Sequence, residues 1–275
     1  MKKTAFLSSV FFLTLGTLYC IVSTRVYAQT FDAAKAYSDY QYQLSIYQQD
    51  YSDFLDAKTF YKENPTLQIK EDTRQKTLKM LRDRDQLMAV YLTAIRMQIL
   101  QTNGFTQDQK NVIYNKIDPE IAWYQAHIKN YLDGDVLEDL FNKSDESKSR
   151  YSTNTTPIID ESLFDIGLSQ EIGLRLAHQQ IYSDLKNYIN TQVSAGKLRI
   201  DPFNRWLNDT DAVLQQLQTN ETTAESKIQL INSQNYNIGT TYDDSTQILT
   251  SSIGPLTQLN NYLSEMLASI QNQLQ

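Results

Sequence analysis

The sequence predicts an all-α protein, an elongated antiparallel bundle of coiled-coil-like hairpins with five or six long helices after an N-terminal export segment. Apolar and tyrosine residues recur at gaps of three and four along most of the chain, which is the spacing of one helix face. Only eight Gly and five Pro interrupt the 275 residues. One Cys excludes an intramolecular disulfide scaffold. Helices of about thirty residues would each be about 45 Å long.

The first 28 residues have the composition of an export signal. Lys2 and Lys3 precede an uncharged, apolar stretch at 4–24. A Val-Tyr-Ala triplet then favours cleavage between Ala28 and Gln29. The alternative is an uncleaved anchor, because 4–24 is at the lower limit of the ~20 apolar residues that span a bilayer. We therefore expect an extracytoplasmic body, either secreted or periplasmic, or membrane-anchored only through 4–24.

The charge balance narrows the class of partner. The chain has 25 Lys and Arg against 32 Asp and Glu, a net charge of −7. Cleavage after Ala28 would remove three cations and no acid, which leaves −10. Nucleic acid is therefore not expected as a partner, and neither is an anionic lipid surface.

Two long helices are predicted first, at 31–62 and 68–102. The first carries an aromatic heptad seam, in which tyrosine stands where leucine is usual. Asn64-Pro65 ends it, since proline disfavours helical backbone in the residue before it. The second helix has an apolar stripe with one polar interruption, Asp85. The two stripes are Tyr37, Tyr40, Leu44, Tyr47, Tyr51 and Phe54, and Leu78, Leu81, Met88, Leu92, Ile95 and Ile99.

Thr106 and Gln109 form a predicted capping box for a third helix. Pro119 lies inside its stripe, so we expect either a kink or a new helical start at this residue. A short amphipathic piece follows at 136–141. Because the turns between these helices are short, sequential neighbours are predicted to pack antiparallel.

The polar segment 142–156 is predicted to be a linker or loop. It separates two helical segments, 29–141 and 157–275, and the sequence leaves open whether these form one bundle or two. The second segment contains predicted helices at 160–195 and 202–232. A last helix is predicted to begin at Gly254-Pro255, and no secondary structure is predicted for 235–252.

The chain contains no recognisable catalytic, phosphate-binding or cofactor-binding motif, so we expect no cofactor and no enzymatic activity. Glu120 and His127 share a spacing of seven residues with Glu171 and His178. These four are weak metal candidates, because a cross-helix site such as His127 with Glu171 is geometrically possible. The alternative, which we favour, is two histidines at the edge of the core. A carboxylate-based enzyme using an acid pair such as Asp160-Glu161 is the least favoured class.

The tyrosines of the first helix have two interpretations. Tyr37, Tyr40, Tyr47 and Tyr51 are either a binding surface or the core-facing stripe, and their helical spacing favours the core. Tyr42 and Tyr61 lie off that stripe or at its end. They are the candidate exposed aromatic contacts.

These observations predict an exported helical structural or interaction module of a cell envelope, bacterial by its Met-Lys-Lys-Thr-Ala start. We expect a protein partner or self-association, for which the regular helix at 202–232 is one candidate surface. The alternative is a ligand-binding or sensory ectodomain tethered by an uncleaved anchor. That class requires a pocket between helices.

Overall fold

The computed structural model describes residues 32–229 and 238–274. The predicted export segment 1–28, with the 4–24 stretch and the Ala28–Gln29 cleavage site, lies outside these residues. Within them every element is helical and no strand occurs, which confirms the predicted all-α class. Six helices there have between 22 and 39 residues. None of the described helices combines the length and the apolar composition needed to cross a membrane.

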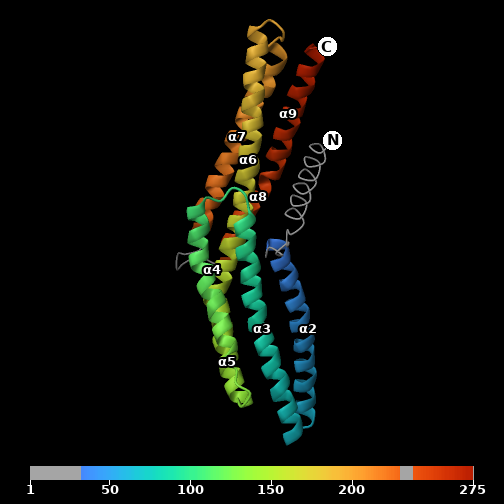
Figure 1. Ribbon diagram of the computed structural model, residues 1–275, viewed down its shortest axis with the longest axis vertical. Helices are drawn as coiled ribbons and strands as arrows, with labels where there is room; N and C mark the ends of the chain where they lie inside the picture. Colours follow the sequence, from blue (N-terminus) through green and yellow to red (C-terminus); the bar gives the residue numbers. More distant parts are fainter. Residues whose placement is uncertain (1–31, 230–237, 275) are drawn as a thin grey trace, which may run out of the picture. The chain divides into compact units, whose positions relative to one another are not determined.

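The elements follow one another through short connections (Figure 1). Their bounds are α2 Ala33–Glu63, α3 Leu67–Gln101, α4 Gln107–Ile128, α5 Leu137–Arg150, the π-helix η1 Tyr151–Thr155, α6 Thr156–Ser194, α7 Asp201–Ile228, α8 Ile238–Ser251 and α9 Ile253–Leu274.

The predicted helix starts and stops are largely local and match the structure. Thr106 and Gln109 form the complete capping box of α4, each side chain bonded to the other residue's backbone N–H. α2 ends at Glu63, two residues before Pro65. Pro119 neither ends α4 nor starts a new helix, because α4 continues through it to Ile128. α8 supplies the helix in the stretch that the sequence left unassigned.

The prediction of a linker or loop at 142–156 is wrong, because α5 and η1 are helical throughout and lead directly into α6. Pro157 has no N–H to donate and its ring crowds the carbonyl one turn earlier, so an ordinary α-turn is disfavoured there. The wider π-turn immediately before it accommodates the proline. Side-chain hydroxyls bond the carbonyls of this turn, among them Thr156 to Tyr151 O at 2.9 Å and Thr153 to Ser149 O at 2.9 Å.

The seam by which α2 contacts α3 is displaced from the predicted one. Tyr37 and Tyr51 are 58% and 43% exposed, although the predicted core stripe included them. The observed seam keeps Tyr40, Tyr47 and Phe54 of the predicted stripe. Its other positions are small or polar residues: Ala33, Ala36, Gln43, Asp50 and Ala57. Asp50 is buried and paired with Lys79, and Gln43 donates to Asp83 Oδ1 at 3.3 Å. A heptad count alone cannot distinguish these adjacent stripes, because they differ by one position.

α3 is covered on two sides, by α2 and by α4. Its contact with α4 buries Leu92, Ile95 and Ile99 against Ile113 and Ile117. The first third of α6 joins this cluster through Ile159 and Ile166. Farther along α6, Tyr182, Leu185 and Ile189 belong to a separate apolar cluster with α7 and α9. Between these two clusters, Phe164 and Leu168 of α6 pack with Ala224 and Ile228 of α7, so α6 contributes to three apolar clusters.

Candidate functional site

Asp85, the polar interruption in the α3 stripe, is completely buried and lies at the centre of a polar cluster. Its Oδ2 is 2.5 Å from His127 Nδ1 of α4, and its Oδ1 accepts from Ser147 Oγ of α5 at 2.8 Å. Arg84 Nε also donates to Oδ1, at 3.1 Å. A buried carboxylate is stable only when its oxygens are paired, and here three donors pair it. We call Arg84, Asp85, His127, Tyr131 and Ser147 the polar centre.

Aromatic rings hold the His127 imidazole in place. Trp123 stacks on it with centroids 4.5 Å apart and 12° between the planes, and Tyr131 meets it edge-on at 5.0 Å. His127 Nε2 has no hydrogen-bond partner among the described residues, and the nearest carboxylate oxygen, of exposed Glu146, is 3.7 Å away. Since Nδ1 faces the Asp85 carboxylate, Nδ1 is the ring nitrogen that donates to it.

Arg84 links the polar centre to α5. Its Nη1 donates to Ser144 Oγ at 2.9 Å and its Nη2 donates to the Tyr131 hydroxyl at 3.1 Å. Burial raises the pKa of Tyr131 well above its ordinary value, and nearby Asp85 acts in the same direction. The phenol therefore stays neutral, and its oxygen accepts a hydrogen bond from the Arg84 guanidinium.

A second buried pair lies about two turns away along α4, seven residues before His127. Glu120 is buried and forms a two-bond ion pair with Arg150, the last residue of α5. Glu120 Oε2 also accepts from Thr155 Oγ1 of η1 at 3.0 Å, and that hydroxyl is 3.0 Å from the Tyr124 hydroxyl. Burial raises the pKa of Tyr124 to about 12. This pair connects the π-turn to α4.

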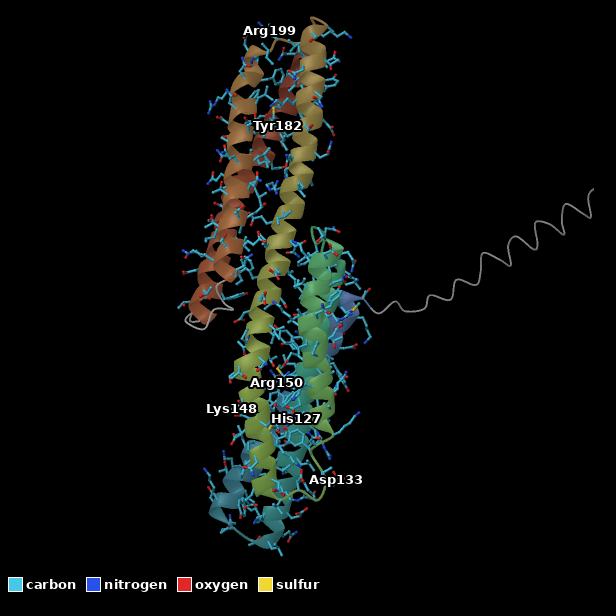
Figure 2. All side chains as sticks on the ribbon, turned by 90° about the vertical axis from the view of Figure 1, so that its left-hand side faces the viewer. His127, Asp133, Lys148, Arg150, Tyr182 and Arg199 are labelled. Carbon is cyan, nitrogen blue, oxygen red and sulfur yellow. The ribbon has the colours of Figure 1, made fainter. Side chains whose placement is uncertain are left out.

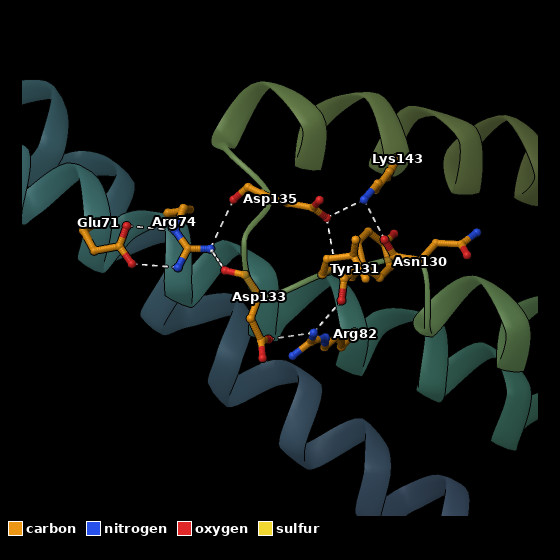
Figure 3. Close-up of polar contacts among 9 residues, drawn as sticks. Glu71, Arg74, Arg82, Asn130, Tyr131, Asp133, Asp135 and Lys143 are labelled. Carbon is orange, nitrogen blue, oxygen red and sulfur yellow. Dashed lines mark hydrogen bonds and ion pairs between the residues drawn. The ribbon is translucent and has the colours of Figure 1, made fainter.

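The connection between α4 and α5 is held by cations (Figure 3). Arg74 Nη1 donates to the carbonyls of Asp133 and Asp135 at 2.8 and 3.1 Å. Arg82 bonds the Tyr131 carbonyl and the Asp133 carboxylate, and Lys143 bonds the Asn130 carbonyl and the Asp135 carboxylate. Oxygens that a metal ion might otherwise coordinate are therefore satisfied by side chains of α3 and α5.

The polar centre differs from a catalytic triad in the order of its members. In a triad the imidazole lies between the nucleophile and the carboxylate. Here Asp85 lies between His127 and Ser147, so the hydroxyl donates to the carboxylate and not to the imidazole. His127 is also almost fully buried, and Figure 2 shows it inside the bundle beside Arg150. The arrangement fixes the position of α5 on α3 and α4, and it does not present a nucleophile.

The predicted metal candidates do not come together. His127 contacts Asp85 on α3, whereas Glu171 of α6 is buried near Glu221 and Arg175. His178 is partly exposed, and its Nδ1 is 2.8 Å from the Leu174 carbonyl oxygen. No group of three or more His, Cys, Asp and Glu side chains in the described part of the chain is placed to hold a metal ion. Asp160 and Glu161 also diverge, since Glu161 pairs with Lys116 at 2.7 Å.

The candidate exposed aromatics differ from each other. Tyr42 is 70% exposed, whereas Tyr61 is partly buried. Their role as contact residues stays a prediction. The polar residues that the sequence analysis missed are Arg84, Arg150 and Ser147. The signal for Arg84 and Ser147 was Asp85, because an acid at a stripe position of a long helix requires buried partners. Arg150 pairs with Glu120 instead.

No family model, no curated protein and no solved structure matches this chain. Function must therefore be argued from the residues and their geometry.

Proposed function

We propose that this protein is an exported helical structural module of a cell envelope, and that it assembles with a second copy of itself through one face of α2. The support for export is the composition of residues 1–28. The support for assembly is the exposed stripe on α2, which is the observation that carries the proposal.

The stripe consists of Tyr37, Leu44, Tyr51 and Leu55, at gaps of seven, seven and four residues. This is the spacing of a face that docks another helix. Tyr37, Tyr51 and Leu55 are exposed and Leu44 is partly so, while α3 is the main packing partner of α2. The stripe lies beside the buried seam on the surface of α2, so the apolar face of this helix extends beyond its contact with α3.

The tyrosines of the stripe pack against other aromatic rings of α2. The Tyr37 ring packs on Tyr40 at 5.9 Å, and the Tyr51 ring lies between Tyr47 at 5.9 Å and Phe54 at 6.2 Å. Side chains held in this way lose little conformational freedom when a partner covers them. Tyrosine is also among the residues enriched at protein interfaces.

The charge distribution on α2 favours a like partner. At 100° per residue, the partly buried acids Asp39 and Asp53 and the exposed acids Asp56 and Glu63 lie away from the stripe. The remaining acid, Asp50, is buried and paired with Lys79 of α3. Two chains of net charge −7 repel each other. A face free of carboxylates is where that repulsion is weakest, and two copies of one patch are self-complementary around a two-fold axis.

The test is sedimentation velocity of the chain beginning at Gln29 over a range of concentrations. We expect a reversible dimer that strengthens with added salt, because salt screens the repulsion. Tyr51→Glu with Leu55→Glu should give a monomer. Tyr51→Glu alone should already weaken the dimer, and Tyr42→Glu is its matched control, since it adds the same single charge to an exposed aromatic on the other side of α2. A monomer at every concentration, or equal effects of both changes, would contradict the proposal.

Export is tested separately by intact mass and fractionation after expression in a bacterial host. A soluble species that begins at Gln29 supports the secreted or periplasmic form. A full-length species in the membrane fraction supports the tethered ectodomain instead. That second class is also favoured by a pocket beside the polar centre.

A further inference from the structure

A pocket of about 240 Å³ lies beside the polar centre, where five elements converge. α2, α3, α4, α5 and η1 each contribute at least one side chain to it. The volume is slightly below the range of about 300–1,000 Å³ that is usual for small-molecule sites. Its lining consists of Tyr47, Arg84, Leu87, Met88, Tyr124, Ser147, Lys148 and Tyr151.

The walls of this pocket are largely aromatic and apolar. Three tyrosines contribute ring faces, and Leu87 and Met88 close the α3 side. A thioether and aromatic rings are polarisable and pack well against a flat ring. Burial raises the pKa of Tyr47, so its phenol is neutral and can donate a hydrogen bond. These walls suit the apolar body of a small ligand.

The charged groups of the lining are both cations. Arg84 is held by Asp85, Ser144 and the Tyr131 hydroxyl, so its position is fixed before any ligand arrives. Lys148 is exposed and has no carboxylate partner among residues 32–229 and 238–274 (Figure 2). No acid lines the pocket. Because Arg84 is already ion-paired with buried Asp85, the unbalanced charge of the lining is the ammonium group of Lys148, and it favours an anion.

The opposite polarity of another pocket shows that this lining is not a general property of the surface. A pocket of about 300 Å³ at the start of α4 is lined by Asp108, Asp165 and Glu225 and contains no cation. The two pockets therefore differ in the sign of their charge while sharing apolar walls. Of these two pockets, the one beside the polar centre combines aromatic walls with the ammonium group of Lys148.

The π-turn contributes to the geometry of the site. It places Thr155 inside, bonded to Glu120, while Tyr151 at its other end lines the pocket. Ser147 lines the pocket and also donates to Asp85, which joins the wall to the polar centre. Buried hydrogen bonds thus support the pocket on several sides, as a preorganised site requires.

We propose that this pocket binds a small aromatic anion, with its ring between Tyr47, Met88 and Tyr151 and its carboxylate at Lys148. Arg84, already ion-paired with Asp85, forms part of the inner wall. This inference does not depend on the proposed assembly through α2.

The test compares three probes that share one ring system and differ in charge: naphthoate, naphthalenemethanol and naphthylmethylamine. Isothermal titration calorimetry with the chain from Gln29 should give saturable binding of naphthoate, weaker binding of the alcohol and the weakest binding of the amine. Lys148→Met keeps the length of the side chain and removes its charge. We expect it to weaken naphthoate binding about tenfold, as loss of a charge-assisted bond does, and to leave the alcohol unaffected.

Two further variants keep the result interpretable. Lys197→Met is the matched control, because Lys197 is an exposed lysine beyond the end of α6 and lines none of the pockets described here. Tyr151→Ala removes a partly exposed ring and should weaken all three probes, since it removes a wall and leaves the charge. Circular dichroism reports whether each variant is folded. Equal affinity for naphthoate and the alcohol, or equal effects of the two lysine changes, would overturn the proposal.

Discussion

Two regions of this protein have cores that are built differently. The polar-cored region, Ala33–Thr155, buries charged and polar side chains between its helices, among them Asp50, Asp85, Glu120 and His127. The apolar-cored region, formed by α7, α9 and the last part of α6, buries Phe203, Leu217, Leu259 and Met266 in one cluster. Figure 2 shows the contrast through its labels, with His127 and Arg150 in the first region and Tyr182 in the second.

The two regions differ in what determines the positions of their helices. In the apolar-cored region, shape and volume decide the packing, because dispersion and burial are not directional. In the polar-cored region, each buried ion pair permits one arrangement, since a displaced partner would leave an unpaired charge. We infer that the polar pairs specify how α5 and η1 sit on α3 and α4.

The largest expected effect is a cavity in the apolar-cored region. Phe203 is fully buried among apolar neighbours, so Phe203→Ala should lower the free energy of unfolding by about 3–5 kcal/mol. The volume-conserving change Leu263→Met should cost less than about 1.5 kcal/mol. Urea denaturation followed by circular dichroism measures both. A similar cost for the two changes would show that volume does not govern this core.

The next effect isolates charge at constant volume. Asp85→Asn keeps the size of the side chain and removes the charge that His127, Ser147 and Arg84 share. We expect a loss of about 2–3 kcal/mol in unfolding free energy, the range for hydrogen bonds to a charged group. Exposed Asp145→Asn is the control and should change little. If the two substitutions cost the same, the polar centre does not specify this packing.

A pH-dependent effect is expected where α6 passes between the two cores. Burial, and secondarily the neighbouring Glu161, raises the pKa of Asp165 from 3.8 to about 7. The folded state therefore binds a proton that the unfolded state releases, and stability falls as pH rises from 3.8 toward 7. Asp165→Asn should remove this component. Above pH 7 it should gain about 2 kcal/mol, a value reduced for the partial exposure of the side chain.

Thermal unfolding of the wild type and of Asp165→Asn across this pH range checks that effect. The melting temperatures of the two proteins, plotted against pH, should coincide at acid pH and separate as pH rises. Parallel curves would show that Asp165 ionises normally in the folded protein.

The smallest effect contrasts surface ion pairs with buried ones. Arg205 and Asp209 pair at 3.4 Å on the exposed side of α7. Solvent screens such a pair, so Arg205→Gln should change the unfolding free energy by about 0.5 kcal/mol or less. A loss as large as that of Asp85→Asn would mean that charge matters equally in both regions. The measurement is the same urea series.

Most of the apolar-cored region could be predicted from the sequence. Phe203, Leu207, Thr210, Leu217, Glu221, Ala224 and Ile228 of the predicted 202–232 stripe are buried in α7. That seam is covered by α6, α8 and α9, so it is the face of a packed bundle helix. The reason for this success is that a long apolar period identifies the buried face directly.

Less of the polar-cored region could be predicted, because its buried residues look like surface residues. Arg150 and Ser147 lie in the polar segment for which a linker was predicted, and they become helical because Asp85 and Glu120 of other helices pair with them. The seam of α2 was misplaced by one position for a similar reason. Asp50 and Gln43 carry no apolar signal, yet both face α3.

The sequence by itself determined the helical class, the start of α4 at its capping box and the end of α2 before Pro65, because each depends on residues within a few positions. Tertiary structure decided which stripe of α2 is buried, the helical state of 142–156 and the pairing of His127 with Asp85. Those outcomes depend on charges that meet from distant helices. A buried ion pair stabilises the fold only when both of its members are buried next to each other, and no local sequence pattern contains that information.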